Sequence, residues 1–244
     1  MKTKRQEKIL NILDKEQYIT LKHLASILDV SEMTIRRDIN ELDKKKLLHK
    51  APGGAKRKAT FLSTDEKIYI NTDLKEEIGK KVNNIINDQD VIFLSAGTTV
   101  SYCIDYINKK DLTIITNSLI AFNKLINLSY KNIYLTGGEY FQNTSEFYGE
   151  HAEGLISNFN IDKAFLATNG VNNNEVSTSH PFLTRLQTLV MQNTKYNYLL
   201  ADSSKFNQTD AYTYASLSNF TGVITDSDIS KKDKIKYSKY TKIL

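Results

Sequence analysis

The sequence contains a single cysteine, Cys103, so an internal disulfide bond is excluded and nothing indicates an oxidising compartment. We interpret Cys103 as a small core residue of a helix. The four histidines are scattered along the chain, and no partner stands at a zinc-ligand spacing from Cys103. We therefore predict no bound metal and no cofactor, and we assign no catalytic residue.

Long apolar runs are also missing. No stretch approaches the ~20 apolar residues that a membrane-spanning helix needs. The first residues, MKTKRQEKILNIL, are charged and lack the apolar stretch of a secretory signal peptide. We therefore expect a cytoplasmic protein without a membrane segment. A length of 244 residues fits one small domain and one larger domain that can bury a substantial core without disulfides.

The segment 19–39, ITLKHLASILDVSEMTIRRDI, has the pattern of two short helices joined by a tight turn. Apolar residues recur at helical spacing in the first helix, and Ser31 is a good N-cap for the second. The second helix buries apolar residues while Thr34, Arg36 and Arg37 point elsewhere. Its N-terminal half can enter a DNA major groove, where its amides and guanidinium groups reach phosphates and base edges. This pattern predicts DNA binding.

A basic hairpin is predicted directly after the helices. The segment 47–50 is a short apolar-to-basic run, the segment 51–55 (APGGA) supplies a turn, and the segment 56–58 (KRK) is basic. A hairpin with basic residues on both sides of a glycine-rich tip is typical of the wing of a winged helix-turn-helix. Such a wing contacts the DNA backbone or minor groove beside the recognition helix.

The charge distribution favours DNA binding over an ordinary helical pair with a solvated charged face. Residues 1–60 hold 15 Lys and Arg against 8 Asp and Glu, a net charge of +7. Residues 61–244 hold 18 against 20, a net charge of −2. The whole-chain excess of +5 therefore belongs to the first quarter of the chain, as a phosphate-binding surface requires.

The rest of the chain alternates short apolar runs with helix-length segments. The runs are rich in β-branched and aromatic residues, which is typical of buried parallel strands with crossover helices. They are Val91–Leu94, Leu112–Ile115, Ile133–Leu135, Ala164–Leu166, Tyr198–Leu200 and Val223–Ile224.

Polar or glycine-containing segments follow these runs: SAGTT, TNS, TGG, ATNG, ADSSK and TD, in chain order. In a parallel sheet such segments share one edge, where the ligands of open α/β folds bind. Gly97 permits a close backbone approach, and Thr98 and Thr99 begin a helix whose amides and dipole favour an anion. Lys205 adds a positive charge and Asp202 a hydroxyl acceptor. The set predicts a small, anionic, hydroxyl-rich ligand such as a sugar phosphate.

Each of these segments also has a purely structural interpretation. Any one of them is explained by helix capping or turn formation, and Asp202 with Lys205 by a surface ion pair worth ~0–1 kcal/mol. Their recurrence after successive strands favours a ligand site.

The chain resembles the DeoR family along nearly its whole length. The helix-turn-helix signature of that family is matched in order and spacing by Arg5, Ile9, Leu13, Ser31, Thr34, Ile35, Arg36, Arg37, Asp38 and Ile39. In the second domain, SAGTT, TNS, GG, DKAF and DSSKF appear in the family's order.

The resemblance implies a set of DNA-binding positions: Ser31, Thr34, Arg36, Arg37, Lys50 and Gly53. Asp38, within the same signature, is interpreted as structural, because a carboxylate facing DNA would be repelled. We expect it to orient a neighbouring arginine or to cap a local turn.

The resemblance also implies an α/β domain of the sugar-phosphate isomerase and CoA-transferase-like type, with a phosphorylated sugar as inducer. Gly97, Thr98 and Thr99 would hold the phosphate, Asn117 and Gly138 would line the pocket, and Asp202 and Lys205 would contact the sugar or its phosphate. Lys67 and Lys75 stand where relatives often place basic residues near the pocket, although we expect both to be solvated.

One position departs from the family pattern. Ser95 stands where many relatives have aspartate, which removes a negative charge from the first loop. His180 and Arg185 fall where the family varies, so they either tune specificity or face water. The wing and the segment KFNQTDAY resemble members induced by tagatose 6-phosphate, while fructose-, ascorbate- and deoxyribose-derived phosphates remain open.

The main alternative is a sugar-phosphate isomerase with an accessory DNA-binding domain. Isomerisation needs a carboxylate base beside the substrate carbon. The segment 161–165 resembles the region where isomerases cluster acids, but Asp162 is followed by Lys163, so the cluster is missing. Asp202 and Lys205 remain a candidate acid–base pair. A further alternative, an architectural nucleic-acid-binding protein, does not account for the glycine- and hydroxyl-rich segments.

We therefore predict a DNA-binding transcriptional repressor, not an enzyme, released by a sugar phosphate. Residues 1–57 form a winged helix-turn-helix domain of α+β type, with the helix-turn-helix at about 20–39. Residues 58–73 are a linker, and residues 74–244 form an α/β effector-binding and oligomerisation domain. The expected partners are a double-stranded DNA operator, the effector and further copies of the chain, as a dimer or tetramer.

Overall fold

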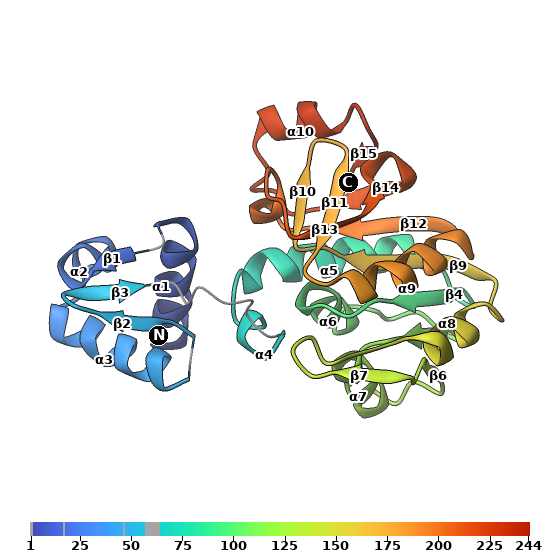
Figure 1. Cartoon of the computed structure of the whole chain (residues 1–244), viewed down its shortest axis with the longest axis horizontal. Coiled ribbons are helices and arrows are strands. Elements are labelled where there is room, and N and C mark those ends of the chain that lie inside the picture. Colours follow the sequence, from blue (N-terminus) through green and yellow to red (C-terminus); the bar gives the residue numbers. More distant parts are fainter. Residues whose placement is uncertain (1, 17, 46, 57–63) are drawn as a thin grey trace. The chain divides into compact units, whose positions relative to one another are not determined.

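The computed structural model describes residues 2–16, 18–45, 47–56 and 64–244. Contacts within the chain divide it into two compact units, Met1–Asn71 and Thr72–Leu244 (Figure 1). The predicted linker, 58–73, lies partly outside the described residues, so its bounds stay a prediction. No helix among the described residues is both long and apolar enough to cross a membrane.

The N-terminal unit combines short helices with a small antiparallel sheet, whose strand order is β1-β3-β2. Apolar side chains from α1, α2 and α3 bury one another, with Ile9, Leu24 and Ile35 fully enclosed. The elements are α1 (Lys2–Glu16), β1 (Tyr18–Thr20), α2 (Leu21–Leu28), α3 (Glu32–Lys44), β2 (His49–Ala51), β3 (Gly54–Lys56) and α4 (Thr64–Lys67).

The predicted helix-turn-helix is confirmed, and its turn has a clear local cause. The side chain of Thr20 accepts a hydrogen bond from the His23 amide and caps α2. At the other end of α2, Asp29 adopts a left-handed conformation (φ 51°), which terminates the helix. Ser31 then caps α3 by accepting a bond from the Thr34 amide, as its position predicts.

The C-terminal unit is built on a seven-stranded sheet of order β15-β14-β12-β9-β4-β5-β6, in which all neighbouring strands are parallel. The predicted apolar runs all coincide with strands of this sheet. These strands are β4 (Val91–Leu94), β5 (Thr113–Thr116), β6 (Asn132–Leu135), β9 (Ile161–Ala167), β12 (Thr194–Leu200) and β14 (Gly222–Ile224), with β15 (Lys242–Ile243) at one edge.

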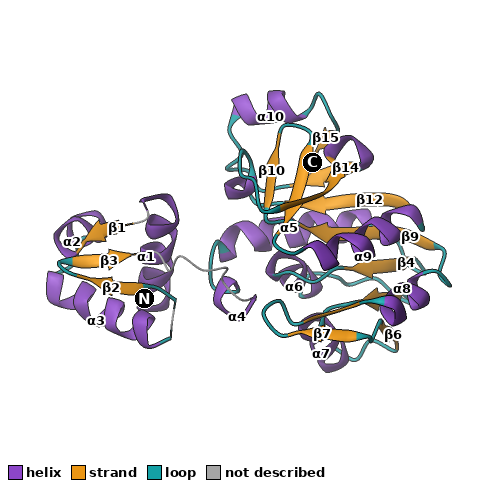
Figure 2. Ribbon diagram, viewed as in Figure 1, coloured by secondary structure: helices purple, strands orange, loops and turns teal. Residues whose placement is uncertain are grey.

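Helices cover both faces of this sheet (Figure 2). Successive strand residues bury against opposite faces: Ile92 packs with α5, α6 and α7, whereas Phe93 packs with α8, α9 and α10. The helices are α5 (Thr72–Ile85), α6 (Thr98–Ile104), α7 (Leu119–Asn127), α8 (Glu150–Ile156), α9 (Pro181–Gln192) and α10 (Lys231–Tyr237), with short 3-10 turns at Ser203–Lys205 and Leu217–Asn219. This arrangement confirms the predicted α/β class.

Two further groups of strands were not predicted from the sequence. An antiparallel sheet of order β10-β11-β13 comprises Gly170–Asn172, Glu175–Thr178 and Tyr212–Ser216. A hairpin of β7 (Glu139–Phe141) and β8 (Glu146–Tyr148) follows β6. These strands are three to five residues long and each carries polar residues, so the sequence shows no distinct apolar run there.

Candidate functional site

Helix α3 presents a polar outer face opposite its buried face. Ile35, Asp38, Ile39 and Leu42 are buried in the N-terminal unit. At about 100° per residue, Met33, Arg37 and Lys44 lie on the opposite side of the helix, and all three are exposed. Arg36 is also exposed, at the side of this face. The two predicted guanidinium groups are therefore free of the core.

Ser31 and Thr34 hold the beginning of α3. The two hydroxyl oxygens lie 3.0 Å apart in a mutual hydrogen bond, and the Thr34 amide donates to Ser31 Oγ at 3.3 Å. Ser31 is exposed and Thr34 is half-buried. Ser31 thus caps the helix, and the Thr34 hydroxyl bonds to this cap, so the first turn that precedes Arg36 and Arg37 is fixed.

Asp38 has the structural role expected of it, but its partner comes from another helix. Its carboxylate is 1% exposed and accepts bonds from Arg5 Nε at 2.5 Å and Arg5 Nη2 at 3.2 Å. Donating this hydrogen bond to Asp38 raises the pKa of Arg5. Because Arg5 belongs to α1, this ion pair joins α1 to α3.

The predicted wing is a hairpin formed by β2 and β3. Its first strand is tied to α3, because the Lys50 amide donates to Asp43 Oδ1 at 3.2 Å. Its tip is tied to β1, because the Tyr18 hydroxyl donates to the Pro52 carbonyl at 3.0 Å. Lys50 and Gly53 are both exposed. Of the predicted basic run, residues 57 and 58 lie outside the described residues.

In the C-terminal unit, Asn117 connects the carboxyl ends of neighbouring strands. It is 3% exposed, and its Oδ1 accepts from the Ala96 amide at 3.0 Å. Its Nδ2 donates to Glu146 Oε2 at 2.9 Å and to the Phe147 carbonyl at 3.3 Å. One side chain therefore links the segment after β4, the end of β5 and the β7–β8 hairpin.

The segment after β4 lies close to the end of β9. Gly97 has φ 137°, and a Cβ there would stand 2.6 Å from the Cβ of Ala167, so glycine is required. Ser95 Oγ accepts from the Ala167 amide at 2.9 Å, so this departure from the family pattern serves to join two strand ends. Thr98 and Thr99, which follow in the first turn of α6, are 9% and 7% exposed.

Gly138 opens the β7–β8 hairpin at the end of β6. Its φ is 101°, and a Cβ there would lie 2.4 Å from the Tyr148 carbonyl oxygen. Two residues earlier, the buried Thr136 hydroxyl has no hydrogen-bond partner among the described residues. The Thr225 hydroxyl at the end of β14 is likewise buried without one. A buried hydroxyl with no partner among the described residues is open to a hydrogen bond with water or a ligand.

Asp202 and Lys205 follow β12, two strands away from β4 in the sheet order. The alternative of a surface ion pair does not fit Asp202, which is 1% exposed. Its carboxylate caps the 3-10 turn, accepting from the Ser204 amide at 3.1 Å and from the Ser204 hydroxyl. At the next strand end, burial raises the pKa of Asp226, whose Oδ2 accepts from the Ser203 amide at 2.6 Å.

The two basic residues preceding the sheet have different environments. The expectation that Lys75 is solvated was wrong: it is 3% exposed in α5, and its Nζ lies 5.6 Å from the ring centroid of Tyr102. Packing of α5 against α6 buries it. Lys67 is half-buried in α4 of the N-terminal unit.

Glu146 is the residue of this region that the sequence analysis missed. It is 5% exposed and accepts the bond from Asn117 Nδ2. It stands in a polar segment, QNTSEFYG, whose letters give no sign of burial. Only the return of the hairpin over the end of β5 brings it to this position, through a bridge to Ser118.

Asp162 and Lys163 lie at the amino end of β9, on the edge of the sheet opposite the predicted ligand segments. Asp162 Oδ2 accepts from the Val91 amide at 2.9 Å, and Lys163 forms an ion pair with Asp90. These contacts assign both side chains to holding neighbouring strands together.

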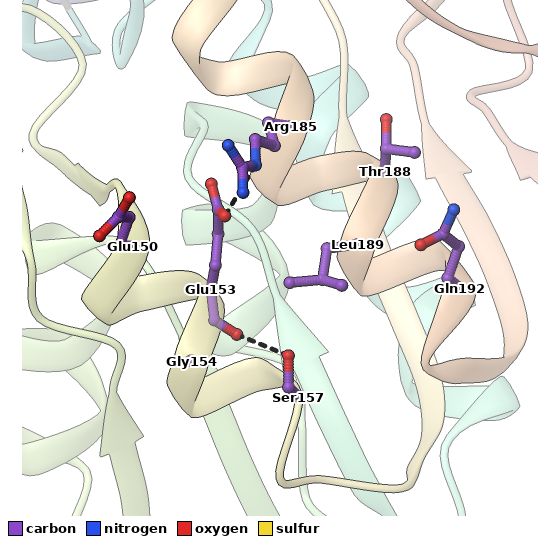
Figure 3. A pocket seen from close by; sticks show the side chains of 8 residues that line it. All are labelled: Glu150, Glu153, Gly154, Ser157, Arg185, Thr188, Leu189 and Gln192. Atoms are coloured by element: carbon purple, nitrogen blue, oxygen red, sulfur yellow. Dashed lines mark hydrogen bonds and ion pairs between the residues drawn. The ribbon is translucent and has the colours of Figure 1, made fainter.

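A separate open depression of about 560 Å³ lies between α8 and α9 (Figure 3). Two of its charged residues pair across the helices, with Arg185 Nε 2.8 Å from Glu153 Oε2. None of the predicted effector residues lines it. Arg185 is 75% exposed there, whereas His180 packs against the rings of Phe141 and Phe182.

The comparison with family models agrees with both units. Residues 5–61 match the DeoR-like helix-turn-helix domain, and residues 70–227 match the DeoR C-terminal sensor domain. The chain belongs to the DeoR family. Among curated relatives of this DeoR-family protein, the lactose phosphotransferase system repressor of Staphylococcus epidermidis is 36% identical over 95% of both chains. The repressor of the same name from Lactococcus lactis is 35% identical over 100% of this chain and 98% of the relative.

Solved structures show a more distant likeness. Ribose 5-phosphate isomerase from Plasmodium falciparum is 21% identical, with a TM-score of 0.40. The match covers 55% of this chain and 53%, about half, of the isomerase chain.

Proposed function

We propose that this DeoR-family protein is a transcriptional repressor of a lactose phosphotransferase operon. The observation that carries the proposal is its similarity, across both domains and nearly end to end, to relatives that bear the name lactose phosphotransferase system repressor. The exposed basic side of α3 gives the proposal its physical basis. Arg36 and Arg37 contact the operator, with Ser31 and Thr34 at the groove and Lys50 and Gly53 of the wing on the backbone.

The proposed inducer site lies at the carboxyl edge of the parallel sheet. The phosphate of a sugar phosphate is held by Gly97, Thr98 and Thr99, Asn117 and Gly138 line the pocket, and Lys205 and Asp202 contact the sugar or its phosphate. Two observations support this site: the contacts through which Asn117 gathers three segments, and the unpartnered Thr136 hydroxyl beside them. Tagatose 6-phosphate is the proposed inducer.

Lys75 and Lys67 have a lesser part in this proposal. The ammonium group of Lys75 lies over Tyr102 at 5.6 Å, so it contributes a positive field to α6 from within the core. Lys67 is proposed as a further basic residue that binds the effector. Because it belongs to the N-terminal unit, its participation is testable only in the intact chain.

Release from DNA requires that the inducer bind one arrangement of the protein more tightly than another. The proposed repressor is a homo-oligomer whose C-terminal units pair, so that two winged helices read half-sites separated by multiples of ~10–10.5 base pairs. An inducer that favours an arrangement with a different spacing weakens DNA binding. A coupling free energy of ~1–3 kcal/mol between the two sites is sufficient for regulation.

We infer that the C-terminal unit senses its ligand without converting it. In support, Asp162 is hydrogen-bonded to the Val91 amide and Lys163 is paired with Asp90. Both contacts lie at the amino edge of the sheet, away from the segments proposed to hold the sugar. The carboxylate of Asp202 is already engaged with Ser204, which leaves it poorly placed as a general base. An isomerase assay on ribose 5-phosphate and tagatose 6-phosphate tests this inference directly, since turnover would refute it.

The proposed function is tested by fluorescence anisotropy with DNA from the protein's own upstream region, at fixed salt. We expect saturable binding that survives excess competitor DNA and is released by tagatose 6-phosphate and not by inorganic phosphate. Arg37→Ala should lose DNA binding and keep sugar-phosphate binding. Lys205→Ala should still bind DNA, but tagatose 6-phosphate should no longer release it. Binding without sequence preference would refute the repressor, and specific binding that no sugar phosphate changes would refute the inducer.

A further inference from the structure

Met33 is an apolar side chain on the polar outer face of α3. It is 67% exposed, and among the large hydrophobic residues of the described chain only Ile235 is more exposed. It stands two positions before Ile35, which is fully buried, and therefore about 160° around the helix from it. The thioether takes no part in the hydrophobic core of the N-terminal unit.

The position of Met33 on the helix is well defined. It is the second residue of α3, between the capping hydroxyl of Ser31 and that of Thr34, whose mutual bond of 3.0 Å holds this turn. Arg37 is one turn further along the same side, and Lys44 lies near the end of that side. In helix-turn-helix proteins, the N-terminal residues of the second helix approach base edges in the major groove.

The chemistry of the side chain limits what it can recognise there. A thioether offers phosphate oxygens neither charge nor a donor, whereas Arg37 and Lys44 on the same side offer both. In the major groove, thymine alone among the four bases presents a methyl group, and apolar side chains contact it. Methionine is flexible and polarizable, so it can adapt to a small apolar surface.

We propose that Met33 reads the 5-methyl group of a thymine in the operator, while Arg37 reaches the phosphates or bases beside it. The assignment rests on the proposed function, because it requires that α3 enter a major groove. It adds a specificity-determining residue to the positions that the family signature supplies, and it predicts that the recognised half-site contains thymine opposite the first turn of α3.

The test begins with a duplex selected from a random DNA pool by the wild-type protein. Each thymine of the selected site is then replaced singly by deoxyuridine, which removes the methyl group and leaves base pairing intact. For the wild-type protein we expect about fourfold weaker binding at the thymine read by Met33, the value for one buried methyl group. Met33→Ala should bind the thymine and uracil duplexes equally.

Two controls separate this effect from a general weakening. Met33→Leu keeps an apolar side chain and should retain part of the preference for thymine. Ile235→Ala removes an equally exposed apolar side chain from the C-terminal unit and should retain all of it. The dependence of the binding constant on salt should be the same for Met33→Ala and the wild type, because no phosphate contact is lost.

The two ways of failing are distinguishable. If Met33→Ala keeps the wild-type ratio between thymine and uracil at every position, the assignment of Met33 is overturned while the selected consensus still supports the proposed function. If the wild-type protein selects no consensus, the proposed function is itself overturned, and the reading of thymine with it.

Discussion

Replacing Arg5 with methionine should destabilise the N-terminal unit and weaken DNA binding without removing a phosphate contact. Asp38 is 1% exposed in the middle of α3 and receives two bonds from the Arg5 guanidinium, at 2.5 and 3.2 Å. Methionine keeps an unbranched stem but no donor. Among the described residues, the Asp38 carboxylate would then retain only the amide of Gln6, 3.4 Å away.

The size of the expected loss in unfolding free energy follows from the burial of Asp38 and Arg5. Removing one partner of a fully buried ion pair costs ~3–5 kcal/mol, because the remaining charge is left without compensation. Arg5 is 24% exposed, so water reaches the vacated site in part, and we expect about 2–3 kcal/mol. The raised pKa of Arg5 gives the sign of the pH dependence. As the pH rises from neutral, the stabilisation is therefore retained up to the ordinary pKa of arginine and is lost only in strong alkali.

Urea unfolding followed by circular dichroism measures this loss. Lys8→Met is the matched control, since Lys8 is an exposed lysine on the same helix, and it should change the unfolding free energy by less than about 0.5 kcal/mol. The double variant Arg5→Met with Asp38→Asn should lose less than the sum of the single variants, because the two residues interact. Arg5→Met should leave the salt dependence of DNA binding unchanged, whereas loss of a phosphate contact would lower the logarithmic slope by about 0.9. An Arg5→Met protein as stable as the control would refute the reasoning.

Three further predictions concern the C-terminal unit. Gly97→Ala should lower the unfolding free energy of the C-terminal unit by about 2–4 kcal/mol, because Gly97 has φ 137° and the new Cβ would meet Ala167. Thermal unfolding measures this loss, and Gly154→Ala is the control, because a Cβ at Gly154 meets no other atom within 4 Å. Asn117→Asp should destabilise the C-terminal unit increasingly as the pH rises, because the carboxylate of the new aspartate would face that of Glu146. Midpoints of urea unfolding that do not change with pH would contradict this prediction. Hydrogen bonds from Asn207 and Ser230 lower the pKa of Asp233, so its stabilising contribution is present above the ordinary aspartate pKa and is lost as the pH falls through the lowered value. Asp233→Asn should therefore weaken the fall of the unfolding free energy at acid pH. An unchanged fall would count against a stabilising role for the Asp233 carboxylate.

Local sequence patterns were sufficient for the helix-turn-helix, the wing and six of the seven strands of the parallel sheet, the exception being the two-residue edge strand β15. Each of these elements depends on residues close together in the chain: a cap such as Ser31, apolar spacing, or a β-branched run such as 91–94. The order of polar segments after the strands was also readable, because parallel strands place all of those ends at one edge. The short strands within 139–148, 170–178 and 212–216 carry no such pattern, and they were missed.

What the individual side chains do at these positions depended on contacts between distant parts of the chain. The sequence alone determined that Asp38 should not face DNA, since its charge is of the wrong sign, but only the packing of α1 against α3 supplied Arg5 as its partner. Likewise Asn117 was readable as a strand-end residue, whereas its bond to Glu146 required the return of a hairpin 29 residues later. Local periodicity decides secondary structure because it concerns one element at a time. Burial and pairing of polar groups are decided by which elements meet, and that is a property of the tertiary structure.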